Sequence, residues 1–553
     1  MSVKLDFAER LRSRGVGVET KASCSAWSAK RRIMGNPFPG PYSTKFHPWM
    51  REILDAKSEF VITLKSAQGG FSEGAINKAL YTIDVCKRDV LYVLPTASNA
   101  QDFSQARFGG ALSESPYLQG LFTATNKVSL KQAGSSNFYI RGSKGDSNLK
   151  SVPASLLILD EYDEFDQKAV GLALERLSGQ VEKEVWFVST PTIPNFGVHK
   201  EYLNTTMEHF MFECPHCGKQ TELLFPECIE IIGEGVNDPR IRESFMKCKE
   251  CGHKLDHEDK PNFLKKAKWV PTYEAGHHSR RGFYINQLYS MTVKPWEIAT
   301  AYFRGLSDDA ANKEFHNSKL GLPFVGDGAQ VTEDQIANCV AGHSLNDARP
   351  IRADRLITLG YDQGKQSYCS IVEWFITDVK DPLPTARAKL LGYYKWDQNS
   401  RGMTDAEIAM IEWQVLAGVV DADPEIGLAR NFARKFRKYI HLCRYRKGIT
   451  GNEMSISDEH TGAGMATVDR TNWMSQTLAL FKTGRIELPR ETSTEFKEHI
   501  KAAVSTWKKD EEGQNVAHYV STGPDHFLHS LVYATIALPF AIKRFYSGGA
   551  DIT

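Results

Sequence analysis

The chain contains 553 residues and has a formal net charge of +1, because 68 Lys and Arg side chains are balanced by 67 Asp and Glu. A single hydrophobic core stops growing at roughly 250 to 300 residues, so we expect two large domains, or two domains and a small insert. The charge balance excludes a global positive field. Any contact with nucleic acid therefore has to come from local basic patches.

Neither end of the chain has the pattern of an export signal or a membrane span. The N-terminal sequence MSVKLDFAERLRSRG lacks the apolar core of a secretory signal. The longest apolar stretch, residues 531–542, contains Pro539 and is shorter than the roughly 20 residues that cross a bilayer, so it predicts a buried helix. Four of the ten cysteines form two CxxC pairs, which favours metal binding in a reducing compartment. We expect a cytosolic protein without membrane contact.

The first chemical motif is FVITLKSAQGGFSEGAINKALYTI, which begins after Glu59. A β-branched run, a glycine turn and a segment of helical spacing predict the strand, loop and helix of a phosphate-binding loop for ATP. The match is imperfect, because Ser66 stands at the first glycine and Phe71 at the usual lysine. A plain turn between strand and helix is the alternative. The predicted nucleotide-binding residues are Lys65, Ser66, Ala67, Gln68, Gly69, Gly70, Phe71, Ser72 and Glu73.

Two further strands support the nucleotide site. In SLLILDEYDEF, residues 155–165, four apolar residues precede Asp160 and Glu161. Parallel sheets bind ligands at such strand ends, so Asp160 is expected to hold Mg²⁺ and Glu161 to polarise the attacking water. The alternative is an acidic cap with Asp163, Glu164 and Asp166 solvated. In EVWFVSTPT, residues 184–192, the terminal hydroxyl residues could sense the γ-phosphate. The consistent order of the three motifs favours an ATPase.

A metal-binding insert is predicted by CPHC and CKEC, which are separated by residues 218–247 and each followed by glycine. Four thiolates satisfy tetrahedral zinc and leave no open position, so the expected site is structural. A redox CxxC is the alternative. His216 and His253 are spare candidates that we expect to be exposed. The predicted zinc ligands are Cys214, Cys217, Cys248 and Cys251.

After Pro350 the pattern changes to three strand-like runs in succession, RLITLGYDQGKQ, SYCSIVEWF and ARAKLLGYYKW. The first run ends at Asp362, which suggests an RNase H-like sheet. The strand in LAGVVDAD delivers Asp421 and Asp423 to a turn, and DHFLHSLVYA begins a helix near Asp525. Such carboxylates can hold two Mg²⁺ or Mn²⁺ ions for phosphodiester hydrolysis, so Asp362, Asp421 and Asp525 are predicted to be catalytic ligands of a nuclease. Capping or a turn is the alternative for each acid.

Two features lie close to these acids. Asp525 and His529 are four residues apart, hence on one helix face, and the preference of Mg²⁺ for oxygen leaves His529 a supporting role. A basic run interleaved with aromatic residues follows Asp421 and could track phosphates, although a solvated helix face is equally common. The basic residues are Arg430, Arg434, Lys435, Arg437, Lys438, Arg444, Arg446 and Lys447, and the aromatic residues are Phe432, Phe436, Tyr439 and Tyr445.

The chain resembles the lambda-type family of phage terminase large subunits. The resemblance rests on KSAQGGFSE, NLKSVPASLLILDEYDEF, CPHCGK, CKECGH, KWVPTYEAGHHSRRGFYINQLYS, FHNSKLGLPF, LAGVVDAD and DHFLHSLVYA, which occur in family order. It implies an ATPase that works on double-stranded DNA in the host cytoplasm with a small terminase subunit, the portal protein of a procapsid and further copies of itself. It also implies that the functional lysine can stand at the start of the loop, as Lys65 does, whereas Phe71 and Glu73 stand where relatives carry a second basic residue.

The expected organisation is an α/β protein with a P-loop ATPase domain that carries a zinc-ribbon-like insert, followed by an RNase H-like nuclease domain. The expected segments are 1–44 (N-terminal segment), 45–205 (ATPase), 206–258 (zinc insert), 259–350 (linking region), 351–545 (nuclease) and 546–553 (tail). Two other functions fit the same motifs. One is a helicase-like repair or restriction enzyme, and the other is a zinc-bearing DNA scaffold without activity.

Overall fold

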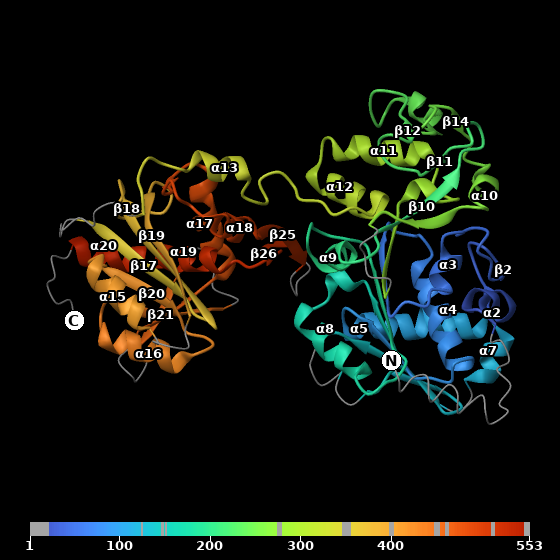
Figure 1. The fold of residues 1–553 in the computed structure, drawn as a ribbon, viewed down its shortest axis with the longest axis horizontal. Helices are drawn as coiled ribbons and strands as arrows, with labels where there is room; N and C mark the ends of the chain where they lie inside the picture. Colours follow the sequence, from blue (N-terminus) through green and yellow to red (C-terminus); the bar gives the residue numbers. More distant parts are fainter. Residues whose placement is uncertain are drawn as a thin grey trace. The chain divides into compact units, whose positions relative to one another are not determined.

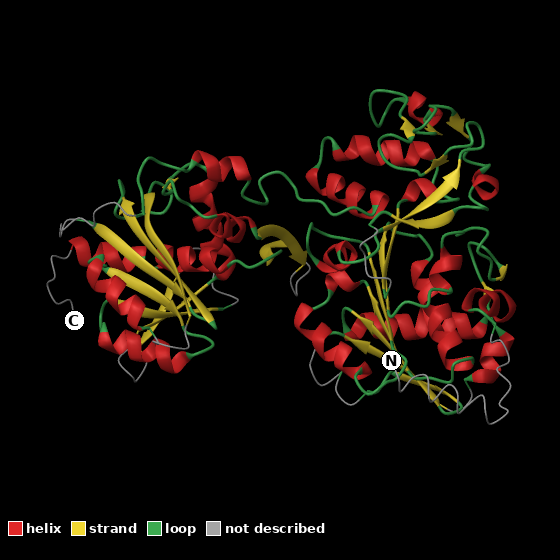
Figure 2. Ribbon diagram, viewed as in Figure 1, coloured by secondary structure: helices red, strands yellow, loops and turns green. Residues whose placement is uncertain are grey.

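The structure is a computed structural model. It describes residues 22–122, 125–144, 149, 152–273, 279–345, 355–397, 403–446, 454–458, 464–509 and 515–546. The chain divides into two compact units, Met1–Phe324 and Val325–Thr553. Each unit contains a mixed sheet with helices on its faces, as Figures 1 and 2 show, so the expected α/β class is confirmed.

The first unit is built on an 11-stranded sheet whose central strands are parallel. The four strands in the middle of the sheet are nearly continuous apolar runs, as expected for strands buried on both faces. Across the sheet the order is β11 (Gln220–Thr221), β10 (Glu208–Glu213), β16 (Arg280–Ile285), β3 (Phe60–Lys65), β9 (Glu184–Ser189), β8 (Leu156–Asp160), β4 (Val90–Leu94), β7 (Ser136–Gly142), β6 (Leu130–Ala133) and β5 (Thr125–Lys127), with β15 (Lys268–Pro271) beside β10.

Helices cover both faces of this sheet. Alternate residues of β3 separate into two cores, since Val61 packs in the cluster that contains helix α4 and Ile62 in the cluster that contains helix α8. The helices of the unit are α2 (Cys24–Arg31), α3 (Met50–Leu54), α4 (Phe71–Asp84), α5 (Ala97–Asp102), α6 (Gly109–Ser113), α7 (Pro116–Leu121), α8 (Gln167–Leu174), α9 (Gly197–Leu203), α10 (Lys260–Phe263), α11 (Pro295–Gly305) and α12 (Asp309–Glu314).

Strand β16 changes the expected division of the chain. It lies between β10 and β3 and pairs with β3 along the whole length of that strand, from Arg280↔Phe60 to Ile285↔Lys65. The expected linking region, 259–350, therefore contributes a central strand to the first unit, which extends to Phe324. Sequence patterns could not show this, because the strand partner is more than 200 residues away. The other expected boundaries stay predictions.

The second unit contains an 8-stranded sheet. Strands β17 and β18 and then β18 and β19 are antiparallel, whereas β20 and β21 continue parallel to β17. The order is β22 (Met454–Asp458), β23 (Gly464–Val468), β21 (Ile440–Tyr445), β20 (Ala417–Asp421), β17 (Leu356–Asp362), β18 (Gln366–Phe375), β19 (Arg387–Asp397) and β24 (Ile486–Glu487). The strands that were expected around Asp362 and Asp421 are present.

Helices cover the two faces of the second sheet. The core on one face contains residues of α15 and α16, and the core on the other contains residues of α17 and α19 (Figure 1). A separate hairpin pairs β25 (Ala503–Lys509) with β26 (Asn515–Ser521). The helices are α13 (Glu333–Asn338), α15 (Thr404–Glu412), α16 (Ile426–Lys435), α17 (Arg470–Lys482), α18 (Thr494–Lys501), α19 (His526–Ile536) and α20 (Leu538–Tyr546).

The apolar stretch 531–542 is buried as expected, but it belongs to two helices. Helix α19 ends at Ile536 and α20 starts at Leu538, with Pro539 in its first turn. Proline has no N–H for a continuing helix and is favoured at a helix start, which accounts for the break. No helix in the described ranges combines the length and apolar character of a bilayer span.

Candidate active sites

The predicted phosphate loop connects β3 to α4. Gly70 has φ +79 and precedes the first helical residue, Phe71. The first N–H groups of a helix have no intrahelical acceptor, so they are available to an anion at this end of α4. The hydroxyl of Ser72 lies 3.4 Å from the Oδ1 atom of Asp160, at the end of β8. The loop, the helix start and this carboxylate therefore meet at one edge of the sheet.

Lys65 and Glu161 are brought together although they are 96 residues apart. The Lys65 ammonium group lies 3.3 Å from Glu161 Oε1 and 3.4 Å from Thr190 Oγ1. Strand β9, which leads to Thr190, lies between β3 and β8, so the ends of three parallel strands supply the cluster. The geometry joins the three motifs that were identified separately in the sequence.

Glu161 and Asp160 have different electrostatic surroundings. Burial raises the pKa of Glu161, and the ammonium group of Lys65 opposes this shift. Asp160 is 2 % exposed and accepts a 2.6 Å hydrogen bond from the Tyr92 hydroxyl. Glu161 has a left-handed backbone, with φ 58 and ψ 46, a strained conformation that is found mainly at functional sites. The carboxylate of Glu161 is thus held beside Lys65, directly after the end of β8.

Phe71 and Glu73 have structural partners away from the loop. Phe71 is 2 % exposed and belongs to the hydrophobic core. The Glu73 carboxylate accepts a 2.8 Å hydrogen bond from Arg32, which is itself buried. These contacts give structural roles to the two residues that depart from the family pattern, and their role in nucleotide binding stays a prediction.

Residues that the sequence analysis assigned no chemistry hold the phosphate loop in place. The N–H of Ser66 donates to Ile285 O, and the N–H of Ala67 donates to Ser318 O. The Gln287 side chain donates to Ala67 O at 2.9 Å, and the Trp49 indole donates to Gly69 O at 3.0 Å. The segments GFYINQLYS and FHNSKLG thus support the loop. Their distinctive sequences were a signal, but only the tertiary contacts reveal the role.

Asp163 was expected to be a solvated acid if the second motif were only an acidic cap, and the structure differs. It is 8 % exposed and accepts hydrogen bonds from Thr192 N, Thr192 Oγ1 and Val198 N at 2.8, 2.8 and 2.7 Å. Burial raises its pKa to about 6 against these hydrogen bonds. Asp163 therefore connects the end of β8 to the segment after β9. Glu164 and Asp166 are exposed.

The four predicted thiol ligands converge. The Sγ atoms of Cys214, Cys217, Cys248 and Cys251 all lie within 4.8 Å of one another. Both knuckles turn at a glycine with φ +70, Gly218 and Gly252, and each turn is closed by a bond from the glycine N–H to the carbonyl of the first cysteine. Four sulfur donors at this spacing fit one tetrahedral zinc ion.

The surroundings of the cysteines fit a small metal-binding subdomain. A three-stranded antiparallel sheet, β12 (Ile229–Glu230), β13 (Phe245–Lys247) and β14 (Lys254–Leu255), lies between and after the two knuckles. His216 and His253 are exposed, as expected, and their rings stack with centroids 3.6 Å apart. A further cysteine, Cys228, is buried outside the four-cysteine cluster.

In the second unit, Asp362 and Asp421 end two neighbouring parallel strands, β17 and β20. Burial raises the pKa of Asp421 to about 6, and the negative charge of Asp362 adds to this shift. Gln363 donates from Nε2 to Asp421 O at 2.9 Å, while its buried Oε1 atom has no protein donor in the described ranges. Two carboxylates at the ends of neighbouring strands and an unpaired oxygen are donors that suit a hard cation.

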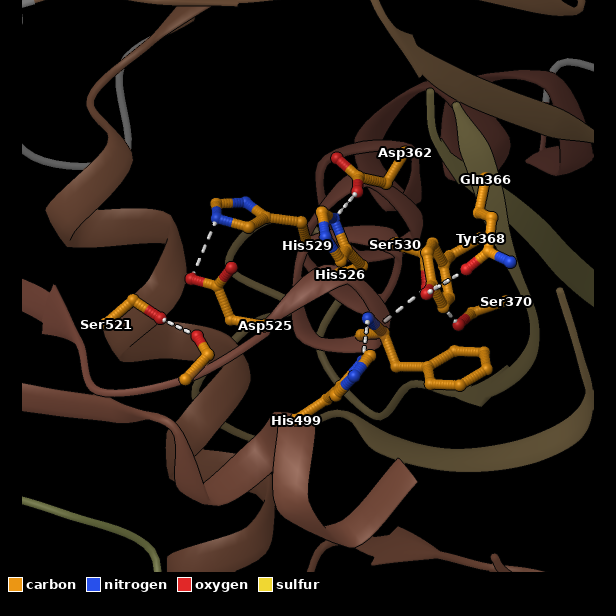
Figure 3. A network of polar contacts seen from close by, with 12 residues as sticks. Asp362, Gln366, Tyr368, Ser370, His499, Ser521, Asp525, His526, His529 and Ser530 are labelled. Carbon is orange, nitrogen blue, oxygen red and sulfur yellow. Dashed lines mark hydrogen bonds and ion pairs between the residues drawn. The ribbon is translucent and has the colours of Figure 1, made fainter. Parts of the chain in front are cut away.

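Asp525 occupies the N-cap position of α19, but its side chain makes no capping hydrogen bond and has other partners. Its Oδ2 atom lies 3.7 Å from Arg470 Nη2 and 3.4 Å from His529 Nε2. His529 also contacts Tyr445 through Nδ1 at 3.2 Å. Asp525 and His529 share one helix face, as expected, and Figure 3 shows the two side chains facing each other. Among the described residues, the three acids do not form a cluster within 4.8 Å.

His526 was missed by the sequence analysis. Its Nδ1 atom lies 2.9 Å from Asp362 Oδ2, as Figure 3 shows. The only signal was its place beside Asp525. No spacing rule connects it to an acid 164 residues away. Asp362 therefore contacts the imidazole of His526, whereas Asp525 contacts the imidazole of His529.

The basic run lies on α16 and the segments that follow it. Arg434, Lys435, Arg437, Lys438, Arg444 and Arg446 are exposed, and Lys447 lies outside the described residues. The interleaved aromatic residues divide: Phe432 is in the core, whereas Tyr439 is 42 % exposed. Arg444 pairs with Asp423 at 3.2 Å, beside the end of β20. These basic residues are exposed, and their contact with DNA stays a prediction.

Fold and candidate sites define the chain as an α/β protein with a phosphate-loop site in one unit and an acidic site in the other. Residues 36–269 match the family model of the phage terminase large subunit gpA, ATPase domain. The terminase large subunits of Escherichia phage lambda and Enterobacteria phage P21 are 25% and 24% identical to the chain. The matches cover 32% and 34% of this chain and 31% and 32% of the relatives, about a third of their length.

The HK97 bacteriophage large terminase is similar in structure, with a TM-score of 0.51 over 93% of this chain and 98% of that chain. At 11% identity this similarity concerns the fold alone. The family match and the two relatives thus show that part of the chain, residues 36–269 in the family model, is similar to phage terminase large subunits.

Proposed function

We propose that the chain is an ATP-driven motor that moves double-stranded viral DNA into a procapsid, and also an endonuclease that cuts concatemeric DNA. The observation that carries the motor is the convergence of Lys65, Glu161 and Asp160 at one edge of a parallel sheet, within the segment that matches the terminase ATPase model. The acid pair in a separate unit supports the nuclease.

In the motor, Lys65 and the free amides of residues 68–72 bind the phosphates, since the amides of Ser66 and Ala67 are already bonded. Bound MgATP supplies the phosphoanhydride bond that is hydrolysed. Ser72 and Asp160 hold the ion, and Glu161 orients the attacking water. Phosphate binding draws Lys65 away from the carboxylate of Glu161, which leaves that carboxylate free to act on water.

In the nuclease, an RNase H-like sheet presents Asp362 and Asp421 as ligands of Mg²⁺ or Mn²⁺, with Asp525 as the third predicted acid. Such ions activate water and stabilise the leaving oxygen of a phosphodiester. The strand order, with an antiparallel pair before the parallel strands, supports this type of sheet. The exposed basic residues that follow β20 in the chain are proposed to guide the DNA backbone.

The cysteine cluster is proposed to hold a structural Zn²⁺ ion in a zinc-ribbon-like insert, because four thiolates leave no position for substrate. The family further implies partners: a small terminase subunit, the portal protein of the procapsid, and further copies of this chain during packaging, all in the host cytoplasm.

A helicase-like repair enzyme and an inactive DNA scaffold compete with this proposal. We expect Glu161→Ala to lose DNA-stimulated ATP hydrolysis and keep DNA cleavage, and Asp362→Ala to show the reverse. A fluorescent duplex and purified procapsids with the small subunit then distinguish translocation from unwinding. Strand separation would favour the helicase, and the absence of ATP turnover in the wild type under all conditions would favour the scaffold.

A further inference from the structure

Tyr368 lies next to both side chains of the Asp362–His526 contact. Tyr368 is the cross-strand neighbour of Asp362 in the β17–β18 pair. The imidazole of His526 stacks on the Tyr368 ring, with centroids 4.8 Å apart and planes 9° from parallel. The ring is therefore oriented by the sheet that positions the carboxylate, and Figure 3 shows the three side chains together.

The start of α19 is fixed as well. The Phe527 N–H donates to His499 Nδ1 at 3.2 Å, and the Ser530 hydroxyl lies 2.6 Å from that of Ser370 on β18. These contacts anchor the first turn of α19 to the sheet and to α18. His526 is half-exposed in spite of this anchoring, so the imidazole is both held in place and accessible to an ion from solvent.

The negative charge of Asp525, by contrast, already has two neighbouring partners. Arg470 lies 3.7 Å and His529 3.4 Å from the Oδ2 atom of this carboxylate. A guanidinium group at that distance lowers the affinity of a carboxylate for a cation, because it repels the cation and stabilises the same negative charge. The group that the fold brings into contact with Asp362 is the imidazole.

We propose that His526 Nδ1 and Asp362 Oδ2 are adjacent ligands of one metal ion, an inference that rests on the proposed nuclease function. Two neighbouring ligands of a six-coordinate ion with bonds of about 2.1 Å are about 3 Å apart. The 2.9 Å separation of these two atoms matches that spacing. The ion site then combines carboxylate oxygens with an imidazole nitrogen.

This ligand set determines ion preference. Mg²⁺ favours oxygen ligands, whereas imidazole suits transition ions such as Mn²⁺ better. The nuclease centre of this chain therefore binds Mn²⁺ in preference to Mg²⁺. Replacing His526 by an oxygen ligand should reverse the preference.

The test is the binding of Mn²⁺ to zinc-loaded, nucleotide-free full chain, followed by electron paramagnetic resonance. A directly bound imidazole gives a nitrogen modulation of the Mn²⁺ spin echo. We expect this signal in the wild type and in the control His343→Gln, a partly buried histidine of the same unit that bonds Leu390 O. We expect His526→Ala to lose the signal and about tenfold in Mn²⁺ affinity, and His526→Asp to lower the ratio of Mn²⁺-supported to Mg²⁺-supported cleavage about tenfold.

Asp362→Asn separates the two levels of the proposal. If Asp362→Asn lowers Mn²⁺ affinity while His526→Ala keeps the nitrogen signal, the imidazole ligand is wrong and the nuclease site stands. If Asp362→Asn leaves Mn²⁺ affinity unchanged, the proposed nuclease site itself is wrong. Circular dichroism of each variant establishes that it is folded before its affinity is compared.

Discussion

At the scale of single residues, the proposed ATPase site contains a charge pair to which we assign two tasks. Lys65 is 6 % exposed and pairs with Glu161, whose pKa is raised by burial. A buried ammonium group next to a single carboxylate is well placed to exchange that partner for phosphate oxygens, which carry more charge. In the proposed mechanism the two side chains therefore act at different steps, binding and hydrolysis.

The two steps can be measured separately. Glu161→Ala should reduce ATP turnover by two orders of magnitude or more, on the order of what removal of a group acting in the transition state costs, and leave nucleotide affinity within a few-fold of the wild type. Lys65→Ala should weaken both. Steady-state hydrolysis and equilibrium binding of a fluorescent ATP analogue provide the readouts. Normal turnover in Glu161→Ala would remove Glu161 from the mechanism.

Asp163 gives the first unit a pH dependence. Its pKa is raised to about 6 from an ordinary value of 3.8, with burial as the main cause. Folding therefore favours the protonated form of Asp163. The stability that results is fully present below the pKa that Asp163 has in the unfolded chain, and it is lost as pH rises through about 6. The side chain introduced by Asp163→Asn is neutral at every pH. The free energy of unfolding of the wild type relative to Asp163→Asn should therefore fall by about 1 kcal/mol between about pH 5 and pH 7. Urea unfolding at several pH values measures it, and a pH-independent difference would contradict the shift.

At the scale of elements, the π-helical turn η7 (Phe315–Leu320) ends at Gly321, against the phosphate loop. Gly321 has φ +65, and a Cβ atom there would lie 2.7 Å from Ser66 N and 2.9 Å from Ile285 O. Only glycine allows the turn to approach so closely. This element, which lies within the expected linking region 259–350, is therefore part of the support of the predicted nucleotide loop.

Gly321→Ala should consequently displace the loop. We expect a loss of about 2 to 4 kcal/mol in stability of the first unit, from the left-handed backbone and the backbone clash together, and a weaker affinity for ATP. Gly134→Ala is the matched control, since Gly134 has φ +59 and a Cβ atom added there would meet nothing within 4 Å. The control should lose roughly 1 to 2 kcal/mol and keep its ATP affinity. Equal ATP affinity in both variants would show that η7 does not hold the loop.

At the scale of the whole molecule, each unit has hydrophobic clusters of its own, and the cysteine cluster belongs to the first unit. The binding energy of a structural zinc ion is part of the folding energy of the residues around it. Chelation should therefore lower the unfolding temperature of the first unit and leave that of the second unchanged. Differential scanning calorimetry of the full chain, before and after chelation, provides the measurement.

Two cysteine variants identify the ligands in the same experiment. Cys214→Ser should lose the bound zinc, about one ion per chain in the wild type, and unfold at lower temperature. Cys228→Ser should keep the zinc, because the Cys228 thiol bonds Glu222 O and lies outside the cluster. Equal zinc contents in the two variants, measured by elemental analysis, would refute the ligand assignment.

The sequence by itself determined the elements and most candidate residues, because these depend on local patterns. Apolar runs that end in Asp160, Asp362 and Asp421 are strands, and the acids lie at their ends as predicted. The glycines after both CxxC pairs turn the knuckles as expected. Such features follow from spacing and backbone preference within a few residues, and they also carried the resemblance to terminases.

Only the tertiary structure decided which distant groups meet. It inserts β16 beside β3, places Gln287 and Gly321 at the phosphate loop, and buries Asp163. It also pairs Asp525 with Arg470 and brings His526 to Asp362. These contacts join residues that are tens to hundreds of positions apart, and the packing of the sheets and helices selects them. No local pattern encodes such a distance, so the partners of the catalytic candidates became visible only in the folded chain.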